Sequence, residues 1–159
     1  MVGVMGPGNA SAEVAHSAEQ LGTGIAEQGW TLLTGGRRVG VMDAASRGAS
    51  TAGGLVVGVL PSSDRSGMSP HVNIPICTGI GSARNNINVL SSDLVIACGV
   101  GMGTLSEILL AAKAGKHVIL LHQTESSEAV LQEFDSNTLH FVSSVEEAIT
   151  LAKKLVELA

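Results

Sequence analysis

Short runs of consecutive apolar residues alternate along this chain with longer stretches in which apolar residues recur every three or four positions. The short runs are rich in valine, isoleucine and leucine, which predicts strands buried on both faces. The longer stretches predict helices with one buried side. We expect strands at residues 2–5, 30–34, 55–60, 73–78, 94–98, 117–121 and 139–142. We expect helices over residues 12–28, 41–52, 82–92, 103–115, 125–133 and 145–158.

Strands and helices that alternate at this spacing form βαβ units with right-handed crossovers and a parallel sheet. We therefore predict the α/β class: a single-domain, three-layer, Rossmann-like, doubly wound parallel sheet over residues 1–159. The composition agrees, because 45% of the residues are hydrophobic and only 2% are aromatic. Small aliphatic side chains of this kind are typical of tightly packed α/β layers.

Charge and composition exclude several classes of partner. A net charge of −5 at pH 7 and the scarcity of aromatic rings argue against nucleic acid, which requires a basic face or stacking platforms. The five histidines lack metal-ligand spacing, so we expect no protein-ligated metal. We expect Cys77 and Cys98 to be buried apolar side chains in a reducing cytoplasm. The chain shows no signal-peptide pattern and no apolar run of membrane-spanning length, so we expect a cytoplasmic location without membrane association.

The stretch over residues 93–107 carries the clearest candidate chemistry. A predicted buried strand is followed by Gly99, Gly101 and Gly103 at alternate positions, and then by a helix that starts near Gly103 or Thr104. A helix start presents unpaired N–H groups and a partial positive charge, and glycine lets the backbone approach an anion closely. This order of elements predicts a cradle for phosphate or a similar anion.

Two further glycine loops follow the first and second predicted strands, and we expect all three loops to meet at one edge of the sheet. The first loop, with Gly6 and Gly8, resembles part of a dinucleotide-binding fingerprint. The second strand, however, ends in glycine where an acid would hold the ribose of NAD, which disfavours a nicotinamide cofactor. The second loop contains Gly35, Gly36, Arg37, Arg38 and Gly40, and we expect at least one of its arginines to reach ligand oxygens.

Two roles are open for the polar residues near the central stretch. Thr104 and Glu107 have the spacing of a capping box, and both could instead face a ligand, with Thr104 as donor. Arg84 lies at a predicted helix start, where its charge opposes the helix dipole. We therefore expect an anion to compensate Arg84, either the Glu107 carboxylate or the ligand.

These residues resemble the motifs of small Rossmann-like proteins once labelled putative lysine decarboxylases. The family signature, Pro-Gly-Gly-x-Gly-Thr-x-x-Glu, corresponds to residues 99–107, with Gly99-Val100 in place of Pro-Gly. A glycine loop ending in Gly-Val-Met lies at residues 35–42. The family includes the LONELY GUY phosphoribohydrolases and the molybdenum cofactor carrier proteins. The carrier branch resembles this chain at residues 4–8, 57–61, 64–65, 74–76, 82–85 and 101–107.

The resemblance to the carrier branch implies a protein that binds, stores or carries molybdenum cofactor, a phosphorylated pterin, without being an enzyme. The pterin dithiolene would hold the metal, and the protein would supply donors for oxygen atoms. Implied partners are molybdoenzymes or cofactor-synthesis proteins, and the implied assembly is a homodimer or homotetramer. The implied ligand-binding residues are Gly6, Gly8, Gly35, Gly36, Arg37, Arg38, Gly40, Ser82, Arg84, Asn85, Gly99, Gly101, Met102, Gly103, Thr104 and Glu107.

The alternative that the resemblance implies is a nucleoside 5′-monophosphate phosphoribohydrolase, which releases a free base. Arg84 and Glu107 would then be catalytic, with Arg84 orienting the sugar phosphate and Glu107 stabilising positive charge or activating water. Asn85 stands where those hydrolases have a lysine, and the loop before Gly101 lacks their Pro-Gly start. These departures favour the binding function.

Overall fold

The computed structural model describes residues 1–134 and 137–157. In these residues the chain forms one seven-stranded sheet with the order β4-β3-β2-β1-β5-β6-β7, and every pairing is parallel. The strands are β1 (Val2–Met5), β2 (Leu32–Thr34), β3 (Val56–Leu60), β4 (Ile74–Cys77), β5 (Leu94–Cys98), β6 (Val118–Leu121) and β7 (Leu139–Phe141).

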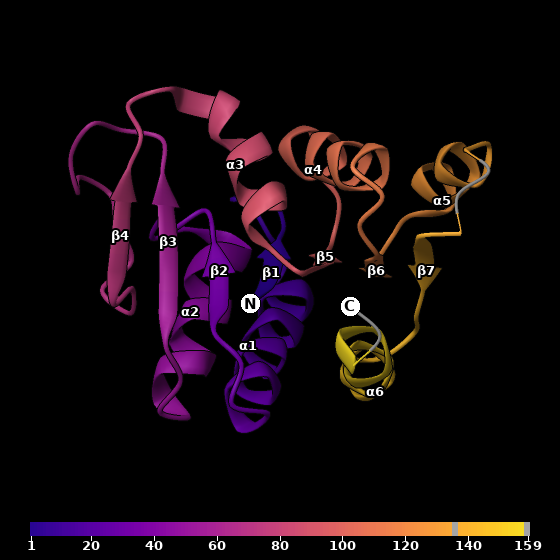
Figure 1. The fold of residues 1–159 in the computed structure, drawn as a ribbon, viewed down its shortest axis with the longest axis horizontal. Helices are drawn as coiled ribbons and strands as arrows, with labels where there is room; N and C mark the ends of the chain where they lie inside the picture. Colours follow the sequence, from indigo (N-terminus) through magenta and orange to yellow (C-terminus); the bar gives the residue numbers. More distant parts are fainter. Residues whose placement is uncertain (135–136, 158–159) are drawn as a thin grey trace.

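Helices cover both faces of the sheet, which confirms the predicted three-layer, doubly wound architecture (Figure 1). One layer consists of α1 (Ala12–Glu27), α2 (Gly40–Thr51) and α6 (Val145–Glu157). The other consists of α3 (Arg84–Ser91), α4 (Met102–Lys113) and α5 (Glu125–Gln132), with the short 3₁₀ helix η1 (Gly81–Ala83) leading into α3. None of the helices in the described ranges is both long enough and apolar enough to cross a membrane.

The hydrophobic core lies on both sides of the sheet, and β5 shows why. Its side chains alternate, because successive residues of a strand point to opposite faces. Leu94 and Ile96 pack into the cluster beneath α1, α2 and α6, whereas Val95 and Ala97 pack into the cluster beneath α3, α4 and α5. All five residues of β5 are buried, as the continuous apolar run predicted.

The order of the strands creates a crevice between β1 and β5. The chain builds β1 to β4 outward in one direction and then returns to place β5 on the free side of β1. The connections after β1 and β5 therefore lead to opposite helical layers, to α1 and α4 respectively (Figure 1). In open α/β sheets, ligands bind at such a switch point, outside the carboxyl ends of the strands.

Most predicted element boundaries are within two residues of the observed ones, and two expectations need comment. The last helix was predicted to reach Leu158, which lies outside the described residues. The expectation that both cysteines are buried is wrong for Cys77, which is exposed, while Cys98 is buried. Cys77 lies on the edge strand β4, where three of four residues are exposed, so an apolar run there does not imply burial.

Candidate anion-binding site

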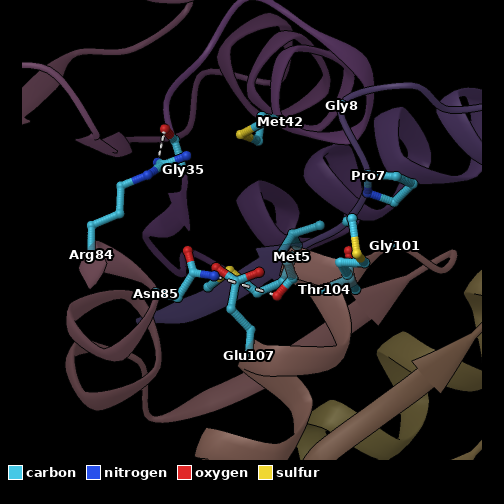
Figure 2. A pocket seen from close by; sticks show the side chains of 14 residues that line it. Met5, Pro7, Gly8, Gly35, Met42, Arg84, Asn85, Gly101, Thr104 and Glu107 are labelled. Atoms are coloured by element: carbon cyan, nitrogen blue, oxygen red, sulfur yellow. Dashed lines mark hydrogen bonds between the residues drawn. The ribbon is translucent and has the colours of Figure 1, made fainter. Parts of the chain in front are cut away.

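A cavity of about 280 Å³ lies at the crevice, and all three glycine loops contribute to it (Figure 2). This confirms that the loops after β1, β2 and β5 meet at one edge of the sheet. Side chains from α2, α3 and α4 complete its wall. The lining residues are Val4, Met5, Gly6, Pro7, Gly8, Gly35, Met42, Arg84, Asn85, Gly101, Met102, Gly103, Thr104 and Glu107.

The N-terminus of α4 opens into this cavity without a side-chain cap. Its N-cap residue is Gly101, whose carbonyl accepts the first backbone hydrogen bond of the helix from the Leu105 N–H at 2.8 Å. The N–H groups of residues 102–104 therefore precede the intrahelical ladder. Three free donors and the positive end of a 12-residue helix together favour an anion at this point.

Of the two roles left open for Thr104 and Glu107, the capping box is not formed, because α4 begins at Met102 and Thr104 is already its third residue. The Thr104 side chain lies in the cavity wall with only 2% of its surface exposed. Its Oγ1 atom has no hydrogen-bond partner. A buried hydroxyl without a partner costs free energy, and an oxygen of a bound ligand would supply the missing bond.

Arg84 joins the loop after β2 to the end of β3. Its Nη1 atom donates hydrogen bonds to the Gly35 carbonyl (Figure 2) and to the Val59 carbonyl, whereas its buried Nε has no partner. Burial lowers the pKa of Arg84, the charge of Glu107 opposes that shift and the charge of Arg37 adds to it. Within the described residues, no ion pair joins Arg84 to Glu107, so the expected compensation of Arg84 by that carboxylate is not observed.

Glu107 is buried in the wall of the cavity, one helical turn after Thr104. Its Oε1 atom accepts a hydrogen bond from the Asn88 amide of α3 at 2.7 Å. Burial raises the pKa of Glu107 to about 7, against the smaller opposing effects of Asn88 and Arg84. Near neutral pH, this carboxyl group is therefore present in both its ionised and its neutral form.

Asn85 supports the first turn of α4 from the neighbouring helix. Its amide nitrogen donates to Ser106 Oγ at 2.8 Å and to the Gly103 carbonyl at 3.4 Å. In Figure 2, Asn85 and Glu107 lie on the same side of the cavity although they belong to α3 and α4. Helices α3 and α4, which begin at the same edge of the sheet, thus both form part of the anion cradle.

Ten of the predicted ligand-binding residues line the cavity, and the others lie outside its lining. Arg37 and Arg38 are exposed, and the Arg38 N–H donates to the Gly67 carbonyl at 2.8 Å. Gly40 has φ +50°, and a Cβ there would lie 2.2 Å from the Pro7 carbonyl oxygen. Gly40 therefore allows the first two loops to touch. The predicted residues outside the lining are Gly36, Arg37, Arg38, Gly40, Ser82 and Gly99.

A family model decides the classification of the chain. The model of the SLOG cluster4 family matches residues 1–149. The chain belongs to this family. The match covers all seven strands and the complete cavity lining, so the candidate site lies within the part that defines SLOG cluster4.

Two solved structures are similar to this SLOG cluster4 protein over nearly its whole length. The molybdenum cofactor binding protein of Rippkaea orientalis shares 51% identity, with a TM-score of 0.95 and coverage of 98% of this chain and 96% of that one. The molybdenum cofactor carrier protein of Chlamydomonas reinhardtii shares 44% identity, with a TM-score of 0.92 and coverage of 98% and 97%.

A more distant relative is the cytokinin riboside 5′-monophosphate phosphoribohydrolase of Mycobacterium tuberculosis, which is 35% identical over 99 residues. That match covers 61% of this chain and 53% of the relative. The chain therefore aligns with about half the length of the hydrolase, in contrast to its nearly complete match with the two cofactor-binding proteins.

Sequence reasoning missed several residues of the cavity wall and its support. Met5 and Pro7 line the cavity although only the glycines of their loop were predicted. Met42 also lines it, and its place in the Gly-Val-Met segment was an available signal. Asn88 was missed entirely, although it lies four residues after Arg84 and therefore on the same side of α3.

Proposed function

We propose that this SLOG cluster4 protein binds molybdenum cofactor and acts as its carrier or store. The observation that carries the proposal is the open N-terminus of α4 together with the buried, unpartnered Thr104 hydroxyl in the same cavity. These donors suit the phosphate or oxo groups of a phosphorylated pterin. The two similar proteins named for this cofactor support the choice among anionic ligands.

The donor set fits a ligand that brings its own metal. The cofactor holds molybdenum through its own dithiolene sulfurs, so the protein has to recognise oxygen atoms and the pterin. The cavity provides backbone N–H groups at α4, the Thr104 hydroxyl and the Arg84 guanidinium for this purpose. Its volume of about 280 Å³ is at the small end of ligand sites, so a phosphorylated pterin would extend beyond its mouth.

The proposal is tested by incubating the purified protein with released molybdenum cofactor and separating the mixture by gel filtration. We expect molybdenum and the pterin to co-elute with the protein and to decay more slowly than in free solution. Thr104→Val should weaken this retention, whereas Thr51→Val, an exposed substitution at the end of α2, should not. Equal decay of the cofactor with and without the protein would contradict the proposal.

A second candidate function is nucleoside 5′-monophosphate phosphoribohydrolysis, and one observation favours it. The Glu107 carboxyl lies in the same cavity as the anion cradle, with a pKa raised to about 7 that suits proton transfer near neutral pH. Water would add to the anomeric carbon as the C–N bond breaks, leaving free base and ribose 5′-phosphate. Release of adenine from AMP, abolished in Glu107→Gln, would establish this activity, and no turnover of purine monophosphates would exclude it.

We further propose that the protein self-associates through the outer face of α3 and α4. Within 84–91 and 102–113, the exposed large apolar side chains are Ile87, Leu90, Met102 and Leu109, and the one exposed charge is that of Lys113. Depletion of charge around apolar side chains is the compositional mark of an interface core. Met102 lines the cavity and is 92% exposed, so a second copy on this face would cover the part of the ligand that extends outward.

A further inference from the structure

Glu107 is an acidic side chain in a cavity whose other polar groups favour an anion. The N–H groups of α4, Thr104 and Arg84 all favour an anion, yet the same wall contains a carboxyl group. The Glu107 side chain is only 7% exposed, so little solvent screens its charge. An ionised Glu107 would therefore repel the ligand that its neighbours attract.

The elements packed against α4 offer little charge to offset Glu107. From α3, Arg84 and Asn88 face it, and Arg84 directs Nη1 at two backbone carbonyls instead. In β5 the titratable side chain is Cys98, and burial raises the pKa of its thiol to about 12. β6 has no titratable side chain, and Arg37 acts on Arg84 from the loop after β2. Protonation is therefore the available way for Glu107 to lose its charge.

Asn88 is suited to both protonation states of Glu107. Its amide N–H donates to Glu107 Oε1 at 2.7 Å, which is the bond that an ionised carboxylate needs. The Asn88 Oδ1 atom is buried without a partner. While the cavity is empty, rotation of the amide would present this oxygen as an acceptor to the O–H of a neutral carboxyl group. When a ligand accepts that O–H, the Asn88 N–H again donates to Oε1. Asn88 and Glu107 can therefore stay hydrogen-bonded whether Glu107 is ionised or protonated.

We propose that an oxyanion entering this cavity is bound together with one proton, which Glu107 takes up from solvent and then shares as an O–H donor with the ligand. This inference rests on the proposed function, because it assigns a regulatory role to the same anion site. The carboxylate gains one proton and no other bond is made or broken. Because Glu107 titrates close to neutral pH, anion affinity falls as the pH rises above about 7.

The experiment is calorimetric titration of the full chain with tungstate from about pH 7.5 to about pH 9, where the free anion is a monomeric dianion and the pH dependence reports on the protein. For the wild-type protein we expect the dissociation constant to rise roughly tenfold per pH unit above neutrality. Titration in buffers of different ionisation enthalpy should report proton uptake that approaches one above about pH 8, where Glu107 of the free protein is ionised. Glu107→Gln should bind tungstate with the same dissociation constant at every pH tested and without proton uptake. Glu146→Gln, an exposed substitution on α6, should behave as wild type.

A second variant keeps the inference falsifiable if Glu107→Gln does not fold. Asn88→Leu retains the carboxyl group but removes the N–H that stabilises its ionised form, so the fall in affinity should move to higher pH. A wild-type affinity without pH dependence, or the same slope in wild type and Glu107→Gln, would overturn the proton linkage and leave the proposed function standing. No tungstate binding by the wild-type protein at any pH would overturn the anion cradle itself, and the proposed function with it.

Discussion

Thr104 and Glu107 lie one helical turn apart on α4, and both side chains are buried in the cavity wall. Thr104 Oγ1 has no hydrogen-bond partner, and Glu107 is a carboxyl group removed from water. Each arrangement costs folding free energy that an apolar or neutral side chain would not. Polar groups left in this condition mark a site shaped for something other than stability.

Glu107→Gln should stabilise the protein at alkaline pH. Burial raises the pKa of Glu107 from 4.5 to about 7 in the folded chain, so the folded state binds more protons than the unfolded state between these values. Wild-type stability therefore falls as the pH rises from about 4.5 to about 7 and stays lower above it, by about 3 kcal/mol. Urea unfolding should show this gain for the variant near pH 8 and little difference near pH 4.5. An equal effect at both values would show that the carboxyl does not titrate in this range.

Thr104→Val should lower the affinity for an oxyanion without lowering the stability of the fold. Valine keeps the shape of threonine and removes the buried hydroxyl that lacks a partner, so the free energy of unfolding should be unchanged or about 1 kcal/mol higher. Oxyanion affinity should fall roughly tenfold, because the ligand loses a donor. Thermal unfolding and tungstate titration measure the two effects. Loss of stability together with unchanged affinity would show that Thr104 has a structural role only.

At the scale of elements, the close approach of α1 to α2 holds two cavity loops in place. A Cβ on Gly48 would lie 1.9 Å from the Glu19 carbonyl oxygen, and a Cβ on Gly22 would lie 2.0 Å from the Ala45 carbonyl oxygen. These contacts are between backbones, so neither helix can yield by rotating a side chain. The loop before α1 and the start of α2 both contribute to the cavity, so the distance between the two helices fixes the positions of these parts of its wall.

Gly48→Ala should therefore destabilise the fold by about 2 kcal/mol or more, because α1 and α2 must move apart. The control is Gly24→Ala on the partner helix α1, where the added Cβ would meet the end of the Ile149 side chain at 3.0 Å. That side chain can shift, so the control should be close to neutral or slightly stabilising. Thermal unfolding measured by circular dichroism compares the two variants. Equal stability of both would show that glycine does not set the spacing of the helices.

The elements that the sequence predicted well are those in which a local pattern decides the structure. The apolar run of β5 specifies burial on both faces. The meeting of the three glycine loops at one edge follows from the parallel order of the strands. The start of α4 was predicted near Gly103 or Thr104 because the apolar residues of helical spacing begin at Leu105, whereas the helix begins at Met102, with Gly101 as its N-cap. The Asn88–Glu107 bond could not be predicted, because it joins two helices whose relative position depends on tertiary packing.

At the scale of the whole molecule, the two helical layers differ in their outer surfaces. No large apolar side chain is exposed in the described residues of α1, α2 and α6, whereas α3, α4 and α5 expose several. Those exposed on the second layer are Ile87, Leu90, Met102, Leu109 and Val130. Within the described residues of α3 and α4 the one exposed charge is that of Lys113, so the exposed acidic side chains behind the net charge of −5 lie outside these two helices, which favours contact between two copies there.

Leu90→Glu tests this asymmetry, because it places a charge at an apolar position that is 54% exposed on α3. We expect the wild-type protein to associate in a concentration-dependent manner in sedimentation velocity, and the variant to shift toward monomer. Burying an unpaired carboxylate in an apolar contact costs several kcal/mol, which exceeds what one leucine contact provides. The matched control is Leu55→Glu, a similarly exposed leucine directly before β3 and outside α3 and α4, which should associate as wild type does. A monomeric wild-type protein, or the same effect of both substitutions, would rule out the face of α3 and α4 as the interface.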